Sequence, residues 1–326
     1  MTNKKTYLIT GITGFLGALI TKTLMQSEEY RDGNITIYGI IRNIEKAHQM
    51  YGDTDNQNLH FVQTDITSPN AFAELECIQI DYMIHCAAST RSAYMISNPV
   101  ETADGIVMGT HNILELARKV QVKSMVYVSS MEVYGKTVDI GRTRTEEELG
   151  EVALESSRSC YPMAKRMAEH YCYIYHQEYG VPVCTARLAQ VFGVGTSMED
   201  TRVYMQFANA VVEKRDIVLK TTGISMGNYC ASDDAVEAIL LLLEKGQAGE
   251  VYNIVNEENT MSIMEMAKLV ARELGENQIQ VKVELEDSSK TGYAPDTQLR
   301  LSGEKMRSLG WCPKKNLIQM YKDILN

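Results

Sequence analysis

The sequence has no long hydrophobic run. Its longest apolar stretch, AILLLL at residues 238–243, is far shorter than the ~20 residues that a membrane-spanning helix needs. The N-terminal residues MTNKKTYLIT lead into a strand-like segment without an apolar signal region. We therefore expect a cytoplasmic protein that does not bind membranes, with residues 238–243 in a buried helix.

Paired cysteines and an excess of basic residues are also absent. The seven cysteines are odd in number and widely spaced, and no C-x-x-C pair occurs, which argues against a disulfide framework or a zinc site. The six histidines have no metal-ligand spacing, so no metal is expected. The net charge of −10 argues against non-specific binding to nucleic acid, whose phosphates attract basic proteins.

The first half of the chain alternates apolar strand-like segments with helix-like segments. Strands are expected at 6–10, 35–41, 59–66, 82–88, 124–130 and 181–188, and helices at 15–26, 109–120 and 161–179. Such alternation predicts an α/β protein with a Rossmann-like, doubly wound parallel sheet that helices cover on both faces.

A glycine-rich turn follows the first predicted strand. TYLITGITGFLGALI contains Gly11, Gly14 and Gly17 in the spacing G-x-x-G-x-x-G, directly after a strand and at the start of a helix. In that context the pattern indicates a dinucleotide site. Gly11 would allow the tight turn, Gly14 the approach of a pyrophosphate and Gly17 close helix packing, with the helix N-terminus facing the anion. The alternative is a plain glycine-rich turn.

The second predicted strand lacks the terminal acid that binds the ribose diol of NAD. Ile41 stands in its place and Arg42 follows. A cation without an acid suits the 2′-phosphate of NADP, so NADP(H) is the expected cofactor and NAD(H) the alternative. Arg42 could instead be a solvated surface arginine. Asp65 and Ile66 end the third predicted strand, where they would flank the adenine, although Asp65 could instead cap a helix.

The pattern changes after about residue 195. Helices are expected at 202–214, 232–245 and 261–274, the last with a capping box formed by Ser262 and Glu265. Short strands are expected at 250–255 and 279–285. We predict an NAD(P)-binding domain at 1–190 and a smaller mixed α/β substrate-binding lobe, mainly 191–326, that covers the cofactor site. Some segments of the lobe would return to the first domain.

Two further motifs carry candidate chemistry. SSMEVYG, residues 129–135, follows the fifth strand, and ligand sites of such sheets lie at the carboxyl ends of the strands. YPMAK places Tyr161 and Lys165 on one face of a helix. The lysine charge favours the phenolate of a neighbouring tyrosine, which can then exchange a proton with a sugar or alcohol oxygen. Ser130 would donate a second hydrogen bond to that oxygen.

With these motifs the chain resembles the extended short-chain dehydrogenase/reductase family, in its branch of NAD(P)-dependent nucleotide-sugar epimerases, dehydratases, decarboxylases and reductases. The matching segments, spread over residues 11–313, are GITGFLG, DI at 65–66, HCAA at 85–88, SSMEVYG, YPMAK, RLAQVFG at 187–193 and LGWCP at 309–313. The resemblance implies oxidation of a sugar at C4 by hydride transfer, alteration of the 4-keto sugar and, usually, return of the hydride.

The resemblance also implies roles for individual residues. The implied catalytic residues are Ser130, Tyr161, Lys165 and Glu132, the last as a base beside the oxidised sugar, with a solvated carboxylate or cap as its alternative. The implied cofactor-binding residues are Gly11, Gly14, Phe15, Leu16, Gly17, Arg42, Asp65, Ile66, Ala87, Ala88, Tyr161, Lys165 and Leu188. The implied substrate-binding residues are Ser89, Met131, Arg202 and Gln190, which replaces a frequent asparagine. The expected partner is a nucleotide sugar, and a homodimer is expected.

Three departures from the family pattern bear on the reaction. Met131 stands where 4,6-dehydratases carry an aspartic acid, and a thioether has no proton to give, which favours epimerisation, decarboxylation or ketone reduction over dehydration. Gly227 or Asn228 occupies the place of a substrate-diphosphate arginine. KTGYAPDTQLR, residues 290–300, replaces an Arg-Pro-Gly type segment, and Arg202 or Arg300 could compensate.

Other interpretations remain for parts of the sequence. The IIRN strand ending also suits a reductase of a non-sugar carbonyl, and a third class is a redox-sensing binding protein without turnover, which usually lacks the tyrosine–lysine pair. His85 and Cys86 are interpreted as packing residues at a buried strand end. The tyrosines of the helix at 161–179 are expected to cover a helix face or a subunit contact, namely Tyr171, Tyr173, Tyr175 and Tyr179.

Overall fold

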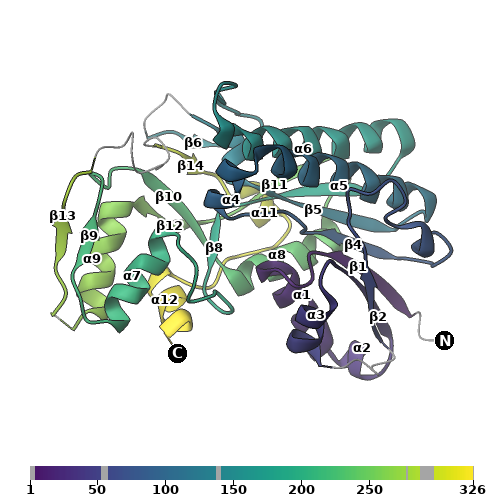
Figure 1. Ribbon diagram of the computed structural model, residues 1–326, viewed down its shortest axis with the longest axis horizontal. Helices are drawn as coiled ribbons and strands as arrows, with labels where there is room; N and C mark the ends of the chain where they lie inside the picture. Colours follow the sequence, from purple (N-terminus) through teal and green to yellow (C-terminus); the bar gives the residue numbers. More distant parts are fainter. Residues whose placement is uncertain (1–3, 53–57, 137–140, 277, 287–296, 326) are drawn as a thin grey trace. The chain divides into compact units, whose positions relative to one another are not determined.

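The computed structural model describes residues 4–52, 58–136, 141–276, 278–286 and 297–325. The chain forms two compact units (Figure 1). Unit 1 comprises Met1–Gly135, Val152–Leu188 and Val236–Tyr252, and unit 2 comprises Lys136–Glu151, Ala189–Ala235 and Asn253–Asn326. The two units therefore interleave along the sequence, with residues 136–151 in unit 2 and residues 236–252 in unit 1.

Unit 1 is built on a seven-stranded sheet with the order β11-β7-β5-β4-β1-β2-β3. The strands, in chain order, are β1 Lys5–Thr10, β2 Ile35–Ile41, β3 Leu59–Gln63, β4 Tyr82–His85, β5 Ser124–Ser130, β7 Val183–Leu188 and the edge strand β11 Val251–Ile254. All pairings from β3 to β7 are parallel. This is the predicted doubly wound Rossmann-like sheet, and its strand order reverses between β1 and β4, where open α/β sheets bind ligands.

Helices cover the sheet of unit 1. Its helices are α1 Phe15–Gln26, α2 Glu28–Arg31, α3 Ile44–Tyr51, α4 Ser92–Ser97, α5 Pro99–Lys119, α6 Cys160–Tyr179 and the greater part of α8 Ser232–Lys245. Helices α5 and α6 run side by side over one face (Figure 1). Their apolar side chains pack on strand residues such as Met83, Met125 and Val183. Most residues inside the strands are apolar because helices bury both faces.

The segment AILLLL lies in α8, as expected, and four of its six side chains, at 238, 239, 242 and 243, are fully buried. Within the described residues, no helix combines the length and the apolar character needed to cross a bilayer.

Three element boundaries in unit 1 differ from the sequence expectations by three residues or more. Helix α5 begins at Pro99, ten residues before the predicted start at Gly109. Gly109 lies within the helix because Ile66 packs against it, and a Cβ there would lie 2.6 Å from Ile66 Cδ1. Strands β3 and β4 end at Gln63 and His85, so the residues that follow them form the irregular edge of the sheet.

Unit 2 contains three small sheets and a separate core. The sheets have the orders β12-β10-β8, β13-β9 and β14-β6. Their strands are β6 Thr143–Arg144, β8 Gln190–Phe192, β9 Ile217–Leu219, β10 Met226–Ala231, β12 Asn256–Ser262, β13 Val281–Val283 and β14 Arg300–Leu301. The helices are α7 Val203–Val212, α9 Ile263–Leu274, α11 Glu304–Ser308 and α12 Leu317–Leu325. The predicted smaller mixed α/β lobe is thus confirmed as a fold.

An aromatic cluster forms the centre of unit 2. Phe192 stacks on Tyr204 with ring centroids 4.4 Å apart and meets the edges of Tyr229 and Tyr321. These four rings bring β8, α7, β10 and α12 into one core with α9. Helix α9 begins with the predicted capping box, in which Ser262 and Glu265 satisfy each other's backbone N–H groups.

Candidate active site

The glycine-rich turn between β1 and α1 is shaped by close backbone contacts. Gly11 has φ = 72°, a left-handed conformation that glycine adopts without strain. A Cβ at Gly11 would lie 3.0 Å from the backbone of Ala87, and a Cβ at Gly17 would lie 2.2 Å from Gly11 O. Gly14 is exposed and begins α1 without a side-chain cap. The first backbone N–H groups of α1 are therefore not taken by a capping side chain, as an anion site requires.

A buried polar chain fixes the neighbouring strand end after β4. His85 lies between Thr10 and Thr110, with Nδ1 2.6 Å from Thr10 Oγ1 and Nε2 3.2 Å from Thr110 Oγ1. The Ala87 N–H donates to Thr10 Oγ1 at 3.1 Å. Burial, followed by the charge of Lys165, lowers the pKa of His85 to about 3, so its imidazole is neutral. His85 is buried as predicted, and it also sets the path of the backbone at Ala87.

The strand ends at β2 and β3 hold the residues expected at the adenosine end of a dinucleotide. Ile41 is buried, whereas the Arg42 side chain is exposed at the carboxyl end of β2. Asp65 accepts hydrogen bonds from the N–H and hydroxyl of Thr67 at 2.9 and 2.8 Å, and these bonds lower its pKa. The Asp65 carboxylate therefore stabilises the turn that follows β3. Ile66 O accepts from Asn112 Nδ2 of α5 at 2.8 Å.

Ser130 and Glu132 share a tight turn at the end of β5. The 3₁₀ turn η2, Met131–Tyr134, begins at Ser130, whose hydroxyl oxygen accepts from the Glu132 N–H at 3.2 Å. This bond uses a lone pair of the hydroxyl and leaves its proton available for donation. Ser130 and Glu132 are both partly exposed. The turn therefore presents a hydroxyl donor and a carboxylate from adjacent positions.

Tyr161 and Lys165 lie on the first turns of α6, which packs against β5. Both side chains are buried, and Lys165 Nζ lies 5.9 Å from the centroid of the Tyr161 ring. The ammonium donates to Val128 O at 2.8 Å and lies 4.7 Å above the Tyr127 ring. Burial lowers the pKa of Lys165 from 10.5 to about 8. The predicted pair is thus brought together, with the lysine anchored on the strand that carries Ser130.

Sequence analysis missed Arg158, which contacts the candidate base. Arg158 lies in the 3₁₀ turn η3, Ser157–Ser159, just before α6, and its Nη2 lies 3.2 Å from Glu132 Oε1. Arg166 of α6 donates from Nε to Val133 O at 2.8 Å, and Val133 lies with Glu132 in the turn η2. The only available sequence signal was a basic residue three positions before Tyr161, and it has no meaning until the turn is located in space.

A buried ion pair lies beneath the site and was also missed. Arg187 of β7 makes a bidentate contact with Glu169 of α6, with Nη2 2.7 Å from Oε2. Ser129 donates to Glu169 Oε1 at 2.5 Å, and Arg187 Nη1 lies 3.2 Å from Tyr134 Oη. Both charged side chains are at least nine-tenths buried. This network joins α6, β5, β7 and η2, the elements that position the predicted catalytic residues.

The remaining predicted residues of unit 1 line the same sheet edge. Ala87, Ala88 and Ser89 follow β4 and are partly exposed, as are Phe15, Leu16 and Met131. Leu188 ends β7 opposite Ser130 and is buried. The structure thus places the cofactor residues, Ser130 and Glu132 around the carboxyl ends of β1, β2, β3, β4, β5 and β7, with Tyr161 and Lys165 on α6, which packs against β5.

The predicted substrate residues of unit 2 differ in how they are used. Gln190 begins β8, and its Oε1 is buried without a hydrogen-bond partner among the described residues. Arg202 pairs with Asp200 through Nε at 3.0 Å and packs over the Tyr204 ring. Arg300 is exposed in β14. Of the segment KTGYAPDTQLR, which replaces the family's Arg-Pro-Gly type segment, residues 290–296 lie outside the described part of the chain.

The positions that replace the expected diphosphate arginine are structural. Asn228 is fully buried in β10, where its Nδ2 donates to Leu299 O at 2.8 Å and its Oδ1 accepts from the Leu301 N–H at 3.0 Å. A Cβ at Gly227 would lie 2.1 Å from Tyr229 Oη. Neither position can substitute for the missing arginine.

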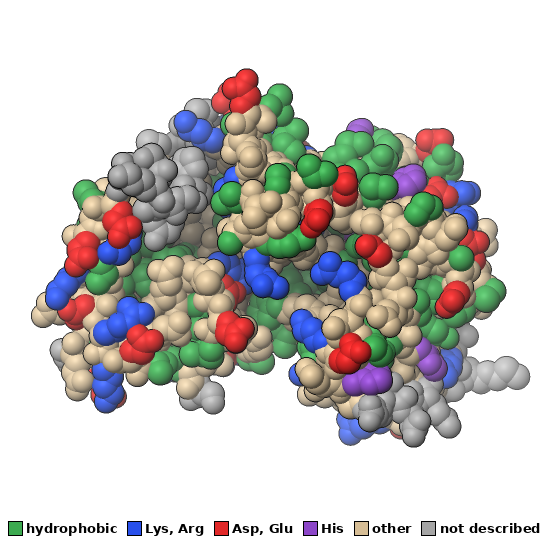
Figure 2. Space-filling view, viewed as in Figure 1, with side chains coloured by type: hydrophobic (Ala, Val, Ile, Leu, Met, Phe, Trp, Pro, Cys, Tyr) green, Lys and Arg blue, Asp and Glu red, His purple; other side chains and the backbone are tan. Residues whose placement is uncertain are grey.

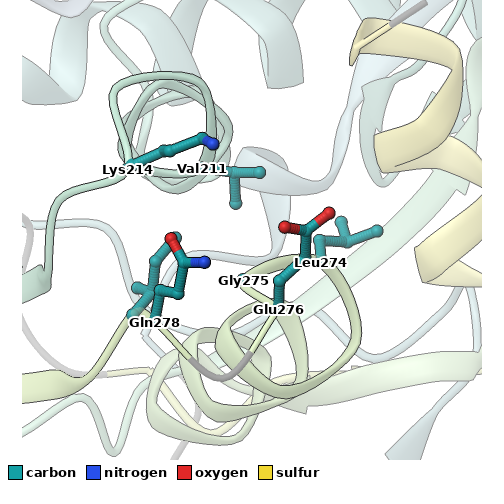
Figure 3. A pocket seen from close by; sticks show the side chains of 7 residues that line it. Val211, Lys214, Leu274, Gly275, Glu276 and Gln278 are labelled. Carbon is teal, nitrogen blue, oxygen red and sulfur yellow. The ribbon is translucent and has the colours of Figure 1, made fainter.

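One pocket of unit 2 has no predicted site residue in its lining. It is a shallow depression between the ends of α7 and α9, with Lys214 and Glu276 at its rim and Val211, Leu274 and Ile279 among its apolar lining (Figure 3). None of the residues expected to bind cofactor or substrate contributes to it.

Comparison with known proteins places these observations in a family. The model of the NAD dependent epimerase/dehydratase family matches residues 7–255. The chain belongs to this family. It is 30% identical to the dTDP-D-glucose 4,6-dehydratase of Mus musculus over 95% of this chain and 84% of that protein. It is 28% identical to UDP-glucuronic acid decarboxylase 6 of Arabidopsis thaliana, again over 95% and 84%.

Solved structures show the same fold. The UDP-glucose 4-epimerase of Thermotoga maritima superposes with a TM-score of 0.80 at 23% identity, over 98% of this chain and 97% of that one. The protein is therefore an enzyme of the epimerase/dehydratase family with an NAD(P) cofactor. The uncapped start of α1 and the positions where a Cβ would clash at Gly11 and Gly17 fit this dinucleotide.

Proposed function

We propose that the enzyme oxidises a nucleotide sugar at C4 and then alters the resulting 4-keto sugar. The alteration is epimerisation or decarboxylation, in preference to 4,6-dehydration. In the third option, reduction, the enzyme would start from a 4-keto sugar and use only the hydride transfer to C4. The gathering of Ser130, Glu132, Tyr161 and Lys165 at one sheet edge supports this proposal. The named relatives, a dTDP-D-glucose 4,6-dehydratase and a UDP-glucuronic acid decarboxylase, support the substrate class.

The four side chains have distinct tasks in this proposal. Tyr161 accepts the proton of the C4 hydroxyl, and Ser130 donates a hydrogen bond to the same oxygen. Lys165, held by Val128 O, places a positive charge next to the tyrosine. Glu132 removes the proton beside the ketone, which the neighbouring carbonyl makes acidic. A bound nicotinamide supplies hydride acceptance at C4 and hydride return.

The single observation that carries the choice of reaction is the pair Met131–Glu132. A 4,6-dehydratase must take the C5 proton and also protonate the departing C6 hydroxyl. Glu132 can perform the first task, but the thioether of Met131 has no proton for the second. Epimerisation, decarboxylation and ketone reduction do not expel that hydroxyl, so they do not need the missing acid.

Two finer features belong to the proposal. Exposed Arg42, next to buried Ile41, supports a preference for NADP(H), because a guanidinium pairs with the 2′-phosphate and no acid repels it.

Exposed methionines on the packed helices α5 and α6 support a homodimer, with exposed fractions of 46% at Met108, 37% at Met163 and 40% at Met167. Hydrophobic side chains gather along the upper edge of Figure 2, where Figure 1 shows α6. A sedimentation mass of one chain would contradict the dimer.

The proposal is tested by a panel of nucleotide sugars. The purified enzyme is incubated with dTDP- and UDP-linked sugars and uronic acids, with NAD⁺ or NADP⁺, and the products are followed by mass spectrometry. We expect turnover of at least one nucleotide sugar without loss of water. A parallel incubation supplies 4-keto sugars and non-sugar ketones with NADPH. Turnover of the non-sugar ketones alone, with no nucleotide sugar converted, would contradict the proposal.

A further inference from the structure

The contact between Arg158 and Glu132 links the turn η2, which follows β5, to the turn η3, which precedes α6. Arg158 Nη2 lies 3.2 Å from Glu132 Oε1, and the two side chains are only 27% and 33% exposed. Arg158 lies three residues before Tyr161, in the turn that leads into α6. The guanidinium therefore connects the candidate base to the element that carries the candidate tyrosine.

The other end of the turn is already secured by backbone contacts. The Glu132 N–H donates to Ser130 Oγ, and Val133 O accepts from Arg166 Nε at 2.8 Å. These bonds fix the backbone of η2 without touching the Glu132 carboxylate. Among the described residues, the carboxylate's ion pair is with Arg158. Arg158 is thus not needed to form the turn, but it limits the rotamers of the Glu132 side chain.

A second observation concerns the rest of the guanidinium. Arg158 Nη1 is buried and has no hydrogen-bond partner among the described residues. Burial of an unpaired donor opposes folding, so the position of Arg158 is a poor choice for stability alone. An unsatisfied buried donor calls for an explanation, and a role at the site is one such explanation.

We propose that Arg158 is a positioning residue that holds the Glu132 carboxylate in one orientation toward the substrate. The inference rests on the proposed function, because it assigns Glu132 a proton transfer beside a C4 ketone. Arg158 does not take part in the oxidation at C4, which uses Tyr161, Lys165 and Ser130. Loss of Arg158 therefore affects the second stage of the reaction and spares the first.

The test separates the two stages with the nucleotide sugar that the wild-type enzyme oxidises in the panel. The first stage is read in single turnovers as growth of the reduced-nicotinamide absorbance. The second stage is read in D₂O as the rate at which the sugar gains solvent deuterium, measured by mass spectrometry. The variants are Arg158→Met, Arg158→Lys, Glu132→Gln and the double variant. Arg118→Met is the matched control, because Arg118 pairs with Glu115 on α5 at comparable exposure.

We expect Arg158→Met to slow deuterium gain by ~10- to 100-fold, the effect of misplacing a reacting group by about 1 Å. The first stage and the melting temperature should stay close to those of Arg118→Met. Arg158→Lys should recover part of the rate because it retains the charge. In the Glu132→Gln background, Arg158→Met should add little, since both changes remove the same proton transfer.

Three results would overturn the inference. If Glu132→Gln slows deuterium gain and Arg158→Met does not, the proposed function survives and the role of Arg158 is wrong. If Arg158→Met slows both stages in parallel with a lower melting temperature, Arg158 is merely structural. If no nucleotide sugar is oxidised, or Glu132→Gln changes nothing, the proposed role of Glu132 fails first and the inference fails with it.

Discussion

Polar side chains are used differently in the two units. In unit 1, buried polar contacts support side chains at a sheet edge: Thr10 and His85 fix the backbone at Ala87, and Val128 anchors Lys165. In unit 2, two polar side chains are engaged within the unit itself: Asn228 is bonded to strand β14 and Arg202 is paired with Asp200. The buried polar contacts named in unit 1 thus support side chains at the sheet edge, whereas those of Asn228 and Arg202 are made within unit 2.

The largest effect expected in unit 1 is on turnover. Tyr161→Phe should lower turnover by ~10²-fold or more, because it removes a positioned acid–base group and changes little else. Tyr173→Phe, on an exposed part of the same helix, is the control and should leave turnover unchanged. Steady-state kinetics on the nucleotide sugar found in the panel measures both variants. Near-wild-type turnover of Tyr161→Phe would remove this residue from the chemistry.

The ion pairs Arg187–Glu169 in unit 1 and Arg202–Asp200 in unit 2 allow a comparison of how much one pair in each unit contributes to the free energy of unfolding. Arg187→Met in unit 1 leaves the buried Glu169 carboxylate without its ion-pair partner, which should cost ~3–5 kcal/mol of unfolding free energy. Arg202→Met in unit 2 breaks a pair whose arginine is 39% exposed, and it should cost ~1 kcal/mol or less. Urea unfolding measures both. Equal losses of unfolding free energy would show that the buried network around Arg187 contributes no more to stability than the more exposed pair in unit 2.

Lys165 predicts a pH dependence of stability. Its folded pKa of about 8 lies below the ordinary 10.5, so the unfolded chain binds the extra proton between these values and wild-type stability rises with pH there. The cost of burying the charge is complete below pH ~8 and amounts to roughly 3 kcal/mol. Lys165→Met should thus be more stable than wild type near pH 7, and this advantage should shrink toward pH 10. Urea titrations of both proteins across this range would contradict the prediction if the difference stayed constant.

The smallest expected effect concerns the cofactor. Arg42→Ala should weaken NADP(H) binding by ~10-fold, as loss of one exposed charge-assisted contact does, and leave NAD(H) binding unchanged. Arg31→Ala, an exposed arginine of α2, is the control. Fluorescence titration with both reduced cofactors gives the dissociation constants. A preference that the Arg42 substitution does not move would mean that this side chain faces solvent.

Local patterns were sufficient for much of unit 1. The strand β1, the glycine turn, α1 and α6 are short-range features, so their residues could be recognised from spacing alone. The first ten residues of α5 were missed because Gly105 and Gly109 weaken a helical pattern, and only the contact of Gly109 with Ile66 explains its place.

Long-range contacts were beyond the reach of the sequence. Arg158 meets Glu132 across 26 positions, and Arg187 meets Glu169 across 18, so neither pair has a local signature. The sequence placed Gly227 or Asn228 where relatives carry a substrate-diphosphate arginine, but it could not show that Asn228 is buried and bonded to Leu299 and Leu301 as part of a sheet.

The most direct test of the proposed chemistry compares wild type with Met131→Asp on dTDP-D-glucose, with NAD⁺ or NADP⁺, by quantifying the 4-keto-6-deoxy sugar nucleotide. Met131→Asn is the control, because it is similar in size to aspartate but supplies no carboxylic acid. We predict that wild type and Met131→Asn form this product slowly and that Met131→Asp raises its yield. Rapid accumulation of the 4-keto-6-deoxy product by the wild-type enzyme would contradict the proposal that Met131 disfavours dehydration.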